Sequence, residues 1–364
     1  MALGGSYGID FGSNSIKVYK AEEGMVYNQK NLIAKRGKSG IVAYGDEAYE
    51  MMEKAPEDVI ITNPVRNGVI TDIDNMQYMY DRILKSLKIR SLPLYRPNFL
   101  VAFPFDITEV EKKAFYDVVE SSQIRPGSVL LIERAIADGV GIGQNVVSAR
   151  GMMIVDVGYE VTEVSVISLG GIVISRLIVN GGEKFDEAIL NVIKRQYNVS
   201  VGQKTAEMLK NSMAVKAVKA DEEAEAETDE SEETEEAVKV EAPKTYTAYG
   251  RHIVTGLPAE VEVEESVLAD SIHDLLLNIV DSVRIILERT PPEISSDIKK
   301  SGIYLTGGSA KIPELRKLLS EQTGLEVFVA DNCETSAVDG LGKIMESKEL
   351  LKFFKELKKS RKFY

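Results

Sequence analysis

The sequence has no tryptophan, one cysteine and two histidines among its 364 residues. A lone cysteine, Cys333, cannot form an internal disulfide, so we expect a protein of the reducing cytoplasm. His252 and His273 are isolated and lack the spacing of metal ligands, and we assign no chemistry to them or to the cysteine. No apolar run approaches the roughly 20 residues of a membrane span. The first residues, MALGGSYGIDF, lack a basic segment followed by an apolar one, so we expect no signal peptide.

Basic residues are not in excess either, and the net charge is −13. The stretch Asp221–Glu236 holds eleven acidic residues and no basic ones, so the rest of the chain carries only −2. Because nucleic-acid binding leaves a basic footprint, we expect no nucleic-acid partner. Residues 216–243 are of low complexity and cannot bury enough apolar surface to fold. We interpret them as a disordered insertion, either a solvated linker or a segment that binds a basic partner.

Apolar strand patterns alternate with helical ones through most of the chain, which predicts an α/β fold. The length exceeds that of one compact core and suits two domains. A strand–turn–strand pattern near residue 8 returns near residue 156, and this modest repeat predicts two similar lobes around a central cleft. Helices are expected over 46–54, 108–119, 134–142, 184–196, 203–211, 266–288 and 312–321, and the main strands over 7–11, 16–19, 98–102, 129–132, 152–155, 164–167, 172–178, 246–254, 260–263 and 302–305.

The first of these turns has the residue types that hold a phosphate. Gly12 allows close approach of the backbone, and Ser13, Asn14 and Ser15 supply N–H and hydroxyl donors. Asp10 would point into the cleft, where a carboxylate can hold Mg²⁺ through water. An ordinary hairpin turn, rich in Gly, Ser and Asn, explains this segment equally well when it is taken alone.

A second glycine turn follows a strand and precedes a helix. Its glycines would let the backbone approach a base or phosphate, and the N-terminus of the helix favours anions. Such turns are common, but two of them about 300 residues apart, with a strand ending in Asp midway, are hard to obtain by chance. The residues of this turn are Thr306, Gly307, Gly308 and Ser309.

With these motifs in place, the sequence resembles the MreB branch of the superfamily that contains actin, sugar kinases and heat-shock chaperone ATPases. The resemblance covers nearly the whole chain outside the acidic insertion. The segments that carry the resemblance are Gly8–Ser13, Asn63–Ile70, Ile107–Glu111, Val164–Val173, Glu288–Glu293 and Gly302–Gly308. The last two of these six segments separate the MreB branch from the rest of the superfamily.

The resemblance implies an actin-like two-lobed fold with ATP and Mg²⁺ in the cleft. Ser13, Asn14 and Ser15 would contact phosphate, and residues 306–309 the adenosine side. Asp156 and Gly158 would form the second phosphate turn, with Asp156 and Asp10 holding Mg²⁺ through water. A T-A-E-x-x-K match places four residues of one helix at the ribose and base, although a solvated amphipathic surface explains the same pattern. These four are Glu207, Met208, Leu209 and Lys210.

The second phosphate turn departs from the family's D-x-G-G-G-T-T-E. Here Tyr159 and Glu160 replace glycines and Val161 replaces a threonine. We expect these side chains to occupy the space of the γ-phosphate, Glu160 to repel it, and nucleotide binding to be weakened.

A further departure affects the residue that orients the attacking water. The family has a carboxylate where this chain has Arg134, and Glu133 lies one residue, or about 100° of helical rotation, away. Glu133 is the remaining catalytic candidate. We predict slow or absent ATP hydrolysis.

Two segments are membrane candidates, because family members dock on membranes through an apolar loop or an amphipathic helix. Leu94 and Tyr95 match the loop, although an ordinary connection bounded by proline explains them equally. Near the C-terminus four apolar residues share one helical face amid lysines, which is typical of an interfacial helix. The alternative is a helix packed on the first lobe. The four residues are Leu350, Phe353, Phe354 and Leu357.

We therefore expect a first lobe over 1–147 with a smaller subdomain at about 30–65. The second lobe spans 148–324, with a smaller subdomain at about 181–257 that contains the insertion at 214–244. Residues 325–346 would return to the first lobe, and 347–364 would form the basic helix.

The resemblance implies a cytoplasmic filament protein on the inner face of the cell membrane, which sets bacterial cell shape by organising cell-wall synthesis. Its partners would be its own copies and cell-wall elongation proteins. The alternative is a degenerate paralogue that scaffolds or regulates an active MreB relative. A phosphotransferase or chaperone has less support, because no sugar-kinase or substrate-domain motif is found.

Overall fold

Two five-stranded sheets of identical topology form the centre of the molecule in the computed structural model, which describes residues 5–37, 40–90, 96–213 and 244–360. Each sheet consists of an antiparallel three-strand meander followed by two parallel strands. The repeat expected from the sequence is therefore confirmed, together with the α/β class. In matching order the sheets are β3 (Gly24–Lys30), β2 (Ser15–Lys20), β1 (Ser6–Phe11), β9 (Asn98–Phe103), β10 (Ser128–Glu133), and β13 (Gly171–Ile178), β12 (Thr162–Ser168), β11 (Met152–Val157), β17 (Ile303–Thr306), β18 (Val327–Val329).

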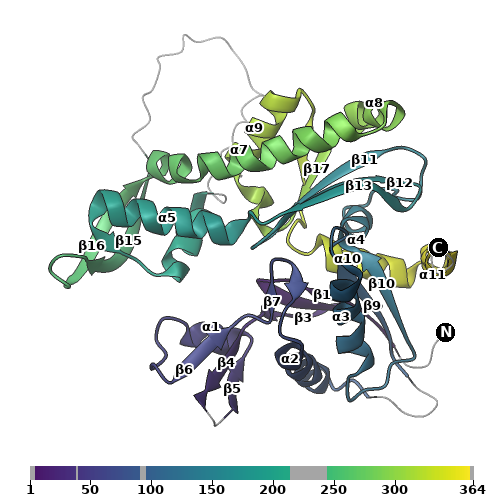
Figure 1. Ribbon diagram of the computed structural model, residues 1–364, viewed down its shortest axis with the longest axis horizontal. Coiled ribbons are helices and arrows are strands. Elements are labelled where there is room, and N and C mark those ends of the chain that lie inside the picture. The colour runs from purple at the N-terminus through teal and green to yellow at the C-terminus, as the bar shows by residue number, and fades with distance from the viewer. Residues whose placement is uncertain (1–4, 38–39, 91–95, 214–243, 361–364) are drawn as a thin grey trace, which may run out of the picture.

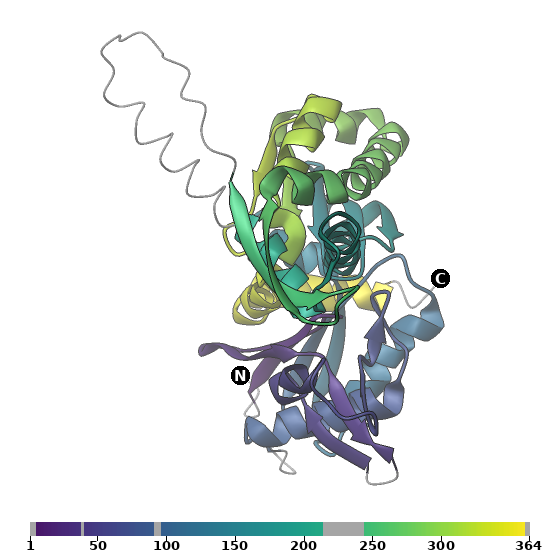
Figure 2. The ribbon, with the colours of Figure 1, turned by 90° about the vertical axis from the view of Figure 1, so that its left-hand side faces the viewer.

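A smaller antiparallel sheet accompanies each large one, and both lie on the same side of the molecule (Figures 1 and 2). A two-stranded hairpin of the first lobe adds β7 (Val65–Arg66) and β8 (Val69–Ile70). The small sheets are β5 (Gly40–Tyr44), β4 (Ile33–Arg36), β6 (Val59–Thr62), and β14 (Val199–Ser200), β15 (Thr245–His252), β16 (Pro258–Glu264).

In the first lobe, α2 and α3 cover one face of the large sheet. Tyr80 of α2 and Phe115 of α3 are fully buried beside Phe11 and Phe99 of the strands. The expected capping box is present, because Thr108 and Glu111 exchange side-chain and backbone hydrogen bonds at the start of α3. The helices of this lobe are α1 (Asp46–Met51), α2 (Ile73–Ser86), α3 (Glu109–Glu120) and α4 (Arg134–Gly141).

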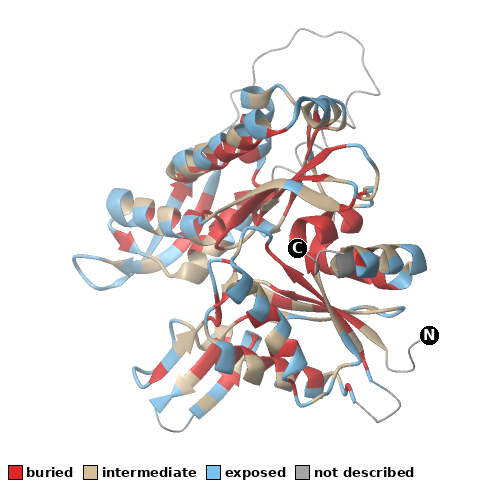
Figure 3. Ribbon diagram, turned by 45° about the vertical axis from the view of Figure 1, so that its right-hand side comes forward, coloured by how far each residue is buried: buried red, intermediate tan, exposed pale blue. Residues whose placement is uncertain are grey.

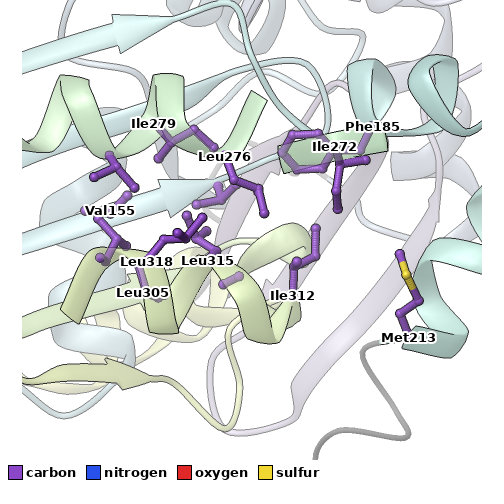
Figure 4. Close-up of a cluster of buried hydrophobic side chains, with 14 of the residues drawn as sticks. Val155, Phe185, Met213, Ile272, Leu276, Ile279, Leu305, Ile312, Leu315 and Leu318 are labelled. Atoms are coloured by element: carbon purple, nitrogen blue, oxygen red, sulfur yellow. The ribbon is translucent and has the colours of Figure 1, made fainter. Parts of the chain in front are cut away.

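The second lobe is built on the same plan, with α5, α7 and α9 packed on its sheet (Figure 4). Phe185 of α5 and Leu276 of α7 are fully buried in this cluster. A helix over residues 203–213 delivers Met213 to the same core. The 25-residue α7 ends just before Pro291 and Pro292, which cannot continue it. The helices are α5 (Gly182–Tyr197), α7 (Glu265–Arg289), α8 (Pro292–Ser301), the 3₁₀ turn η2 (Gly308–Lys311) and α9 (Pro313–Thr323).

The two lobes meet where α4 crosses α10 (Ser336–Glu346). A Cβ atom at Gly340 would overlap the backbone of Ala137, so glycine is needed for so close a crossing. The expected return of residues 325–346 to the first lobe needs correction. Strand β18 completes the second sheet, and only α10 lies against β1 and β2.

The C-terminal helix α11 (Lys348–Ser360) lies between the two halves on the side away from the small sheets (Figure 1). Phe354 is fully buried in a cluster that contains residues of both lobes, and the other three apolar residues predicted to face a membrane, Leu350, Phe353 and Leu357, pack against the same cluster. In Figure 3, α11 carries buried and intermediate colours on part of its surface and exposed ones on the rest.

Phe354 is therefore part of the protein's own core and the other three are partly buried against it, so the structure favours the packed helix over an apolar membrane face. The two loop candidates, Leu94 and Tyr95, and the acidic insertion lie outside the described residues. Among the described helices, none combines the length and hydrophobicity required to span a membrane.

Candidate nucleotide-binding cleft

A cavity of about 410 Å³ lies between the lobes. It is lined by both phosphate-type turns, the helix over 203–213, the turn after β17 and the start of α10. Three of the nucleotide-site residues expected from sequence do not line it: Thr306 is buried in β17, Leu209 belongs to the core of the second lobe, and Met208 is half-exposed. The twelve that do are Asp10, Gly12, Ser13, Asn14, Ser15, Asp156, Gly158, Glu207, Lys210, Gly307, Gly308 and Ser309.

The two phosphate-type turns share one backbone design. Asp10 pairs with Lys17 across β1 and β2, and Asp156 pairs with Glu163 across β11 and β12 at the same spacing. A Cβ atom at Gly12 would lie 2.8 Å from the carbonyl oxygen of Ser15, and one at Gly158 would lie 2.9 Å from that of Val161. Glycine is therefore required in both turns for the same steric reason.

The first turn presents neutral donors and two cations to the cavity. Lys17 donates from Nζ to Ser15 Oγ at 2.8 Å, and Lys30 donates to Asn14 Oδ1 at 2.9 Å. Both lysines line the cavity. Sequence reasoning missed them, although the position of Lys17 opposite Asp10 could have been inferred from the repeat with Asp156 and Glu163.

The helix over 203–213 connects the second lobe to the first. Glu207 accepts hydrogen bonds from Lys30 at 2.9 Å and from Tyr49 at 2.8 Å. Burial alone would raise the pKa of Glu207, but Lys30 and Tyr49 outweigh it and lower that pKa. Lys210 pairs with Asp186 at 2.7 Å, and burial nevertheless raises the pKa of Asp186 to about 6.

The side chains of the second turn mainly contact other residues of the protein. Tyr159 lines the cavity, and its hydroxyl accepts from Gln203 Nε2 at 2.7 Å. Glu160 is 3% exposed and does not line the cavity. It accepts from Arg66 Nη1 at 2.9 Å and from the Asn67 amide at 2.6 Å. The expectation that Glu160 repels the phosphate is therefore corrected, because its charge is used in a bridge between the lobes.

Arg134 lies on the wall of the cavity, bonded to the aspartate of the first turn. Its Nη2 donates to Asp10 Oδ1 at 2.8 Å, and the residue lines the cavity although it is buried. Burial opposes its charge, but the surrounding carboxylates, Asp10 and Asp156 foremost, raise its pKa. Burial raises the pKa of Asp138, which accepts from Ser336 Oγ at 2.6 Å.

This arrangement does not fit a hydrated magnesium ion held by Asp10 and Asp156. Asp10 is already bonded to a guanidinium, and Asp156 interacts electrostatically with the same cation. A divalent ion between them would lie beside a permanent positive charge. Across the described ranges, no group of three or more His, Cys, Asp or Glu side chains has the geometry to hold a metal ion.

The catalytic candidate Glu133 lies outside the cavity lining. It is 2% exposed, and its carboxylate accepts from Lys358 of α11 at 2.5 Å. The prediction that Glu133 acts on a cleft ligand is therefore corrected, since its charge is used to dock the C-terminal helix.

Comparisons with known proteins all indicate one family. The family model described as MreB/Mbl protein matches residues 5–234 and 223–353. The chain is 32% identical to the cell shape-determining protein MreB of Escherichia coli strain K12, over 93% of this chain and 92% of that protein. It is 31% identical to the cell shape-determining protein Mbl of Bacillus subtilis, over 94% and 96%.

Solved structures give the same result. MreB5 of Spiroplasma citri bound to ADP superposes with a TM-score of 0.83 at 28% identity, covering 98% of this chain and 99% of that one. The MamK double helical filament has a TM-score of 0.72 at 17% identity, covering 94% and 98%, and shows the shared fold. With the family model and the relatives spanning nearly its whole length, the chain belongs to the MreB/Mbl family of actin-like proteins.

Proposed function

We propose that this protein binds an adenine nucleotide between its lobes, assembles into actin-like filaments and thereby helps to determine cell shape. The observation that carries the proposal is the cavity lined by the donors of the first turn, Ser13, Asn14 and Ser15, facing Ser309 from the other lobe. Two structural neighbours were solved with ADP and AMPPNP bound, and another is a double helical filament. The curated relatives are named as cell shape-determining proteins.

Filaments of this kind would organise cell-wall synthesis along the inner face of the cell membrane, with cell-wall elongation proteins as partners. Membrane attachment is supported by the exposed lysines of α11, Lys352 and Lys355, rather than by its buried apolar face. Each lysine near an anionic surface contributes about 1 kcal/mol of binding. The degenerate-scaffold alternative is not favoured, because the relatives that match nearly the whole chain are themselves cell shape-determining proteins.

Filament assembly is tested by electron microscopy and sedimentation of the purified protein with ATP, with ADP and without nucleotide. We expect polymers that depend on nucleotide. Ser309→Tyr would fill the cavity and abolish that dependence, whereas Ser320→Tyr, on the exposed side of α9, serves as the matched control. Absence of polymer in every nucleotide state, or identical behaviour of the two variants, would contradict the proposal.

Membrane attachment is tested by co-sedimentation with anionic vesicles. The double variant Lys352→Glu and Lys355→Glu should bind less, and added salt should weaken the wild type, because the attraction is electrostatic. Lys317→Glu is the control, since Lys317 forms the same kind of exposed i,i+4 pair on α9 that Lys352 forms on α11. Vesicle binding that is unchanged by added salt and unchanged in the double variant would argue against this attachment.

A further inference from the structure

We propose that the guanidinium of Arg134 takes the place of the divalent cation, so that this cleft binds a nucleoside di- or triphosphate without magnesium. The inference rests on the proposed nucleotide-binding function and specifies the form of the ligand, which is the free nucleotide anion. It also identifies Arg134 as the residue that makes magnesium unnecessary. The observation that carries it is the buried contact between Arg134 and Asp10 on the wall of the cavity.

Arg134 is held in place by the fold. It is the first residue of α4, directly after β10 ends at Glu133, and its side chain reaches past β9, the strand between β10 and β1, to Asp10. There it donates to Asp10 over 2.8 Å, and both side chains of the pair are 10% exposed. An extended surface arginine would not be fixed in this way, because it would keep its rotamer freedom.

Carboxylates from both lobes surround this one cation. Asp10 comes from β1, Asp138 from α4, and Asp156 and Glu163 from β11 and β12 of the other lobe. Arginine cannot be deprotonated in a protein, so the positive charge is permanent. One guanidinium therefore supplies the neutralising charge at the point where the aspartates of the two turns converge.

The guanidinium is also suited to phosphate. It is planar and has five N–H donors that match phosphate oxygens in pairs. Its Nε atom is buried without a hydrogen-bond partner in the described part of the chain. Lys17, directly across the β1–β2 pair from Asp10, lines the same cavity and provides a second cation. A polyphosphate in the cavity would meet both cations.

A magnesium ion would have to compete with this arrangement. To bind Asp10, directly or through water, it would have to share this carboxylate with the guanidinium, which already occupies Oδ1. Arg134 would then lie beside a divalent ion of like charge. The guanidinium of Arg134 therefore excludes a magnesium ion from this position.

The test is a titration of the full chain with a fluorescent ATP analogue, once with excess magnesium and once with EDTA. We expect the two dissociation constants of the wild type to agree within about twofold. Arg134→Glu should create a magnesium requirement, because a further carboxylate then joins Asp10, Asp138 and Asp156 at the cavity and the guanidinium is gone. For that variant we expect EDTA to weaken binding by at least about tenfold relative to magnesium.

Two further variants keep the test interpretable. Arg134→Gln removes the charge with little change of shape, and we expect it to respond to magnesium in the same direction as Arg134→Glu. Arg284→Glu, exposed on α7, makes the same charge change away from the cleft and should bind as the wild type does. Circular dichroism establishes that each variant is folded.

The outcomes separate the two proposals. Wild-type binding that needs magnesium would overturn this inference and leave the nucleotide-binding function standing. Binding in neither condition would overturn both. Magnesium-independent binding that persists in folded Arg134→Glu and Arg134→Gln would overturn the assignment to Arg134.

Discussion

The two phosphate-type turns of this protein have the same backbone but different chemistry. Both contain eight residues from the aspartate of one strand to its paired residue on the next, and both need a glycine at the third position. Ser13, Asn14 and Ser15 of the first turn correspond in order to Tyr159, Glu160 and Val161 of the second. The first set faces the cavity with small polar groups, whereas in the second Glu160 is directed at Arg66 and only Tyr159 and Val161 reach the cavity.

The difference shows which features the fold fixes and which it leaves free. The strand pairing and the glycine are set by sterics, so both halves keep them. The three side chains at the tip carry no such constraint and have acquired new partners in the second half. There Glu160 bridges to Arg66, and Tyr159 accepts from Gln203. The second turn has thus become a connection between the lobes, while the first keeps the character of a ligand site.

The largest effect expected from this difference is on ATP hydrolysis. Arg134 stands where the resemblance to the family implies a water-orienting carboxylate, and Glu133 is bonded to Lys358. Losing a positioned acid–base group lowers a rate roughly 10²–10⁴-fold. We expect phosphate release slower by that factor than for MreB of Escherichia coli assayed alongside. Equal rates for the two proteins would show that the arginine at this position does not slow hydrolysis.

A pH dependence of stability is expected from Glu163, which holds the place in the second turn that Lys17 holds in the first. Burial raises the pKa of Glu163 from 4.5 to about 7, although the Phe105 amide and Arg134 oppose the shift. Because the folded state holds this proton more tightly, the stability is present below pH 4.5 and is lost as the pH rises to about 7. Asp186, with a pKa raised to about 6, acts in the same direction.

Urea unfolding between these pH values should therefore show a fall of about 2–3 kcal/mol in the free energy of unfolding. Glu163→Gln should reduce this slope and leave the parts due to Asp186 and Asp138. Glu109→Gln, an exposed change on α3, is the control and should keep the wild-type slope. If the pH dependence of the free energy of unfolding is unchanged in Glu163→Gln, Glu163 is not a source of that dependence.

The shared backbone predicts that the two turn glycines are equally sensitive. Gly12→Ala and Gly158→Ala each push a Cβ atom against a carbonyl oxygen, which we expect to cost about 1–3 kcal/mol of stability. Gly308→Ala is the control, because its Cβ would meet only the Glu334 side chain at 3.9 Å. Thermal or urea unfolding measures all three, and a large loss for only one of the turn glycines would break the equivalence.

The smallest effect concerns the bridge made by the second turn. Arg66→Ala removes a half-exposed cation from the buried Glu160, which keeps its bond to the Asn67 amide. We expect a loss of about 1 kcal/mol in the free energy of unfolding. Arg36→Ala breaks an ion pair to Asp58 that is exposed on both sides, and it should cost less. If both variants lose the same amount, burial of Glu160 contributes nothing.

Local patterns in the sequence were sufficient for the fold. Alternating apolar residues around Gly12 and Gly158 define hairpins whatever their surroundings, and the capping box at Thr108 is contained within four residues. These features depend on sterics and hydrogen bonds between near neighbours. The architecture and most of the residues of the cleft were therefore predictable.

The directions of individual side chains were not predictable, because they depend on partners far along the chain. Glu160 turns to Arg66, 94 residues away, and Glu133 turns to Lys358, 225 residues away. The amphipathic pattern of α11 shows that one face avoids water. It does not show whether protein or lipid covers that face, and Phe354 proved to lie in the core.

The most direct measurement of the contrast between the turns is the nucleotide affinity of paired variants. Ser13→Ala with Ser15→Ala removes two hydroxyls of the first turn and should weaken binding roughly 10- to 100-fold, because hydrogen bonds to charged groups are lost. Tyr159→Ala should change the dissociation constant by less than about threefold, since that hydroxyl is bonded to Gln203. Equal weakening by both variants, or undiminished binding in the first-turn variant, would contradict the account.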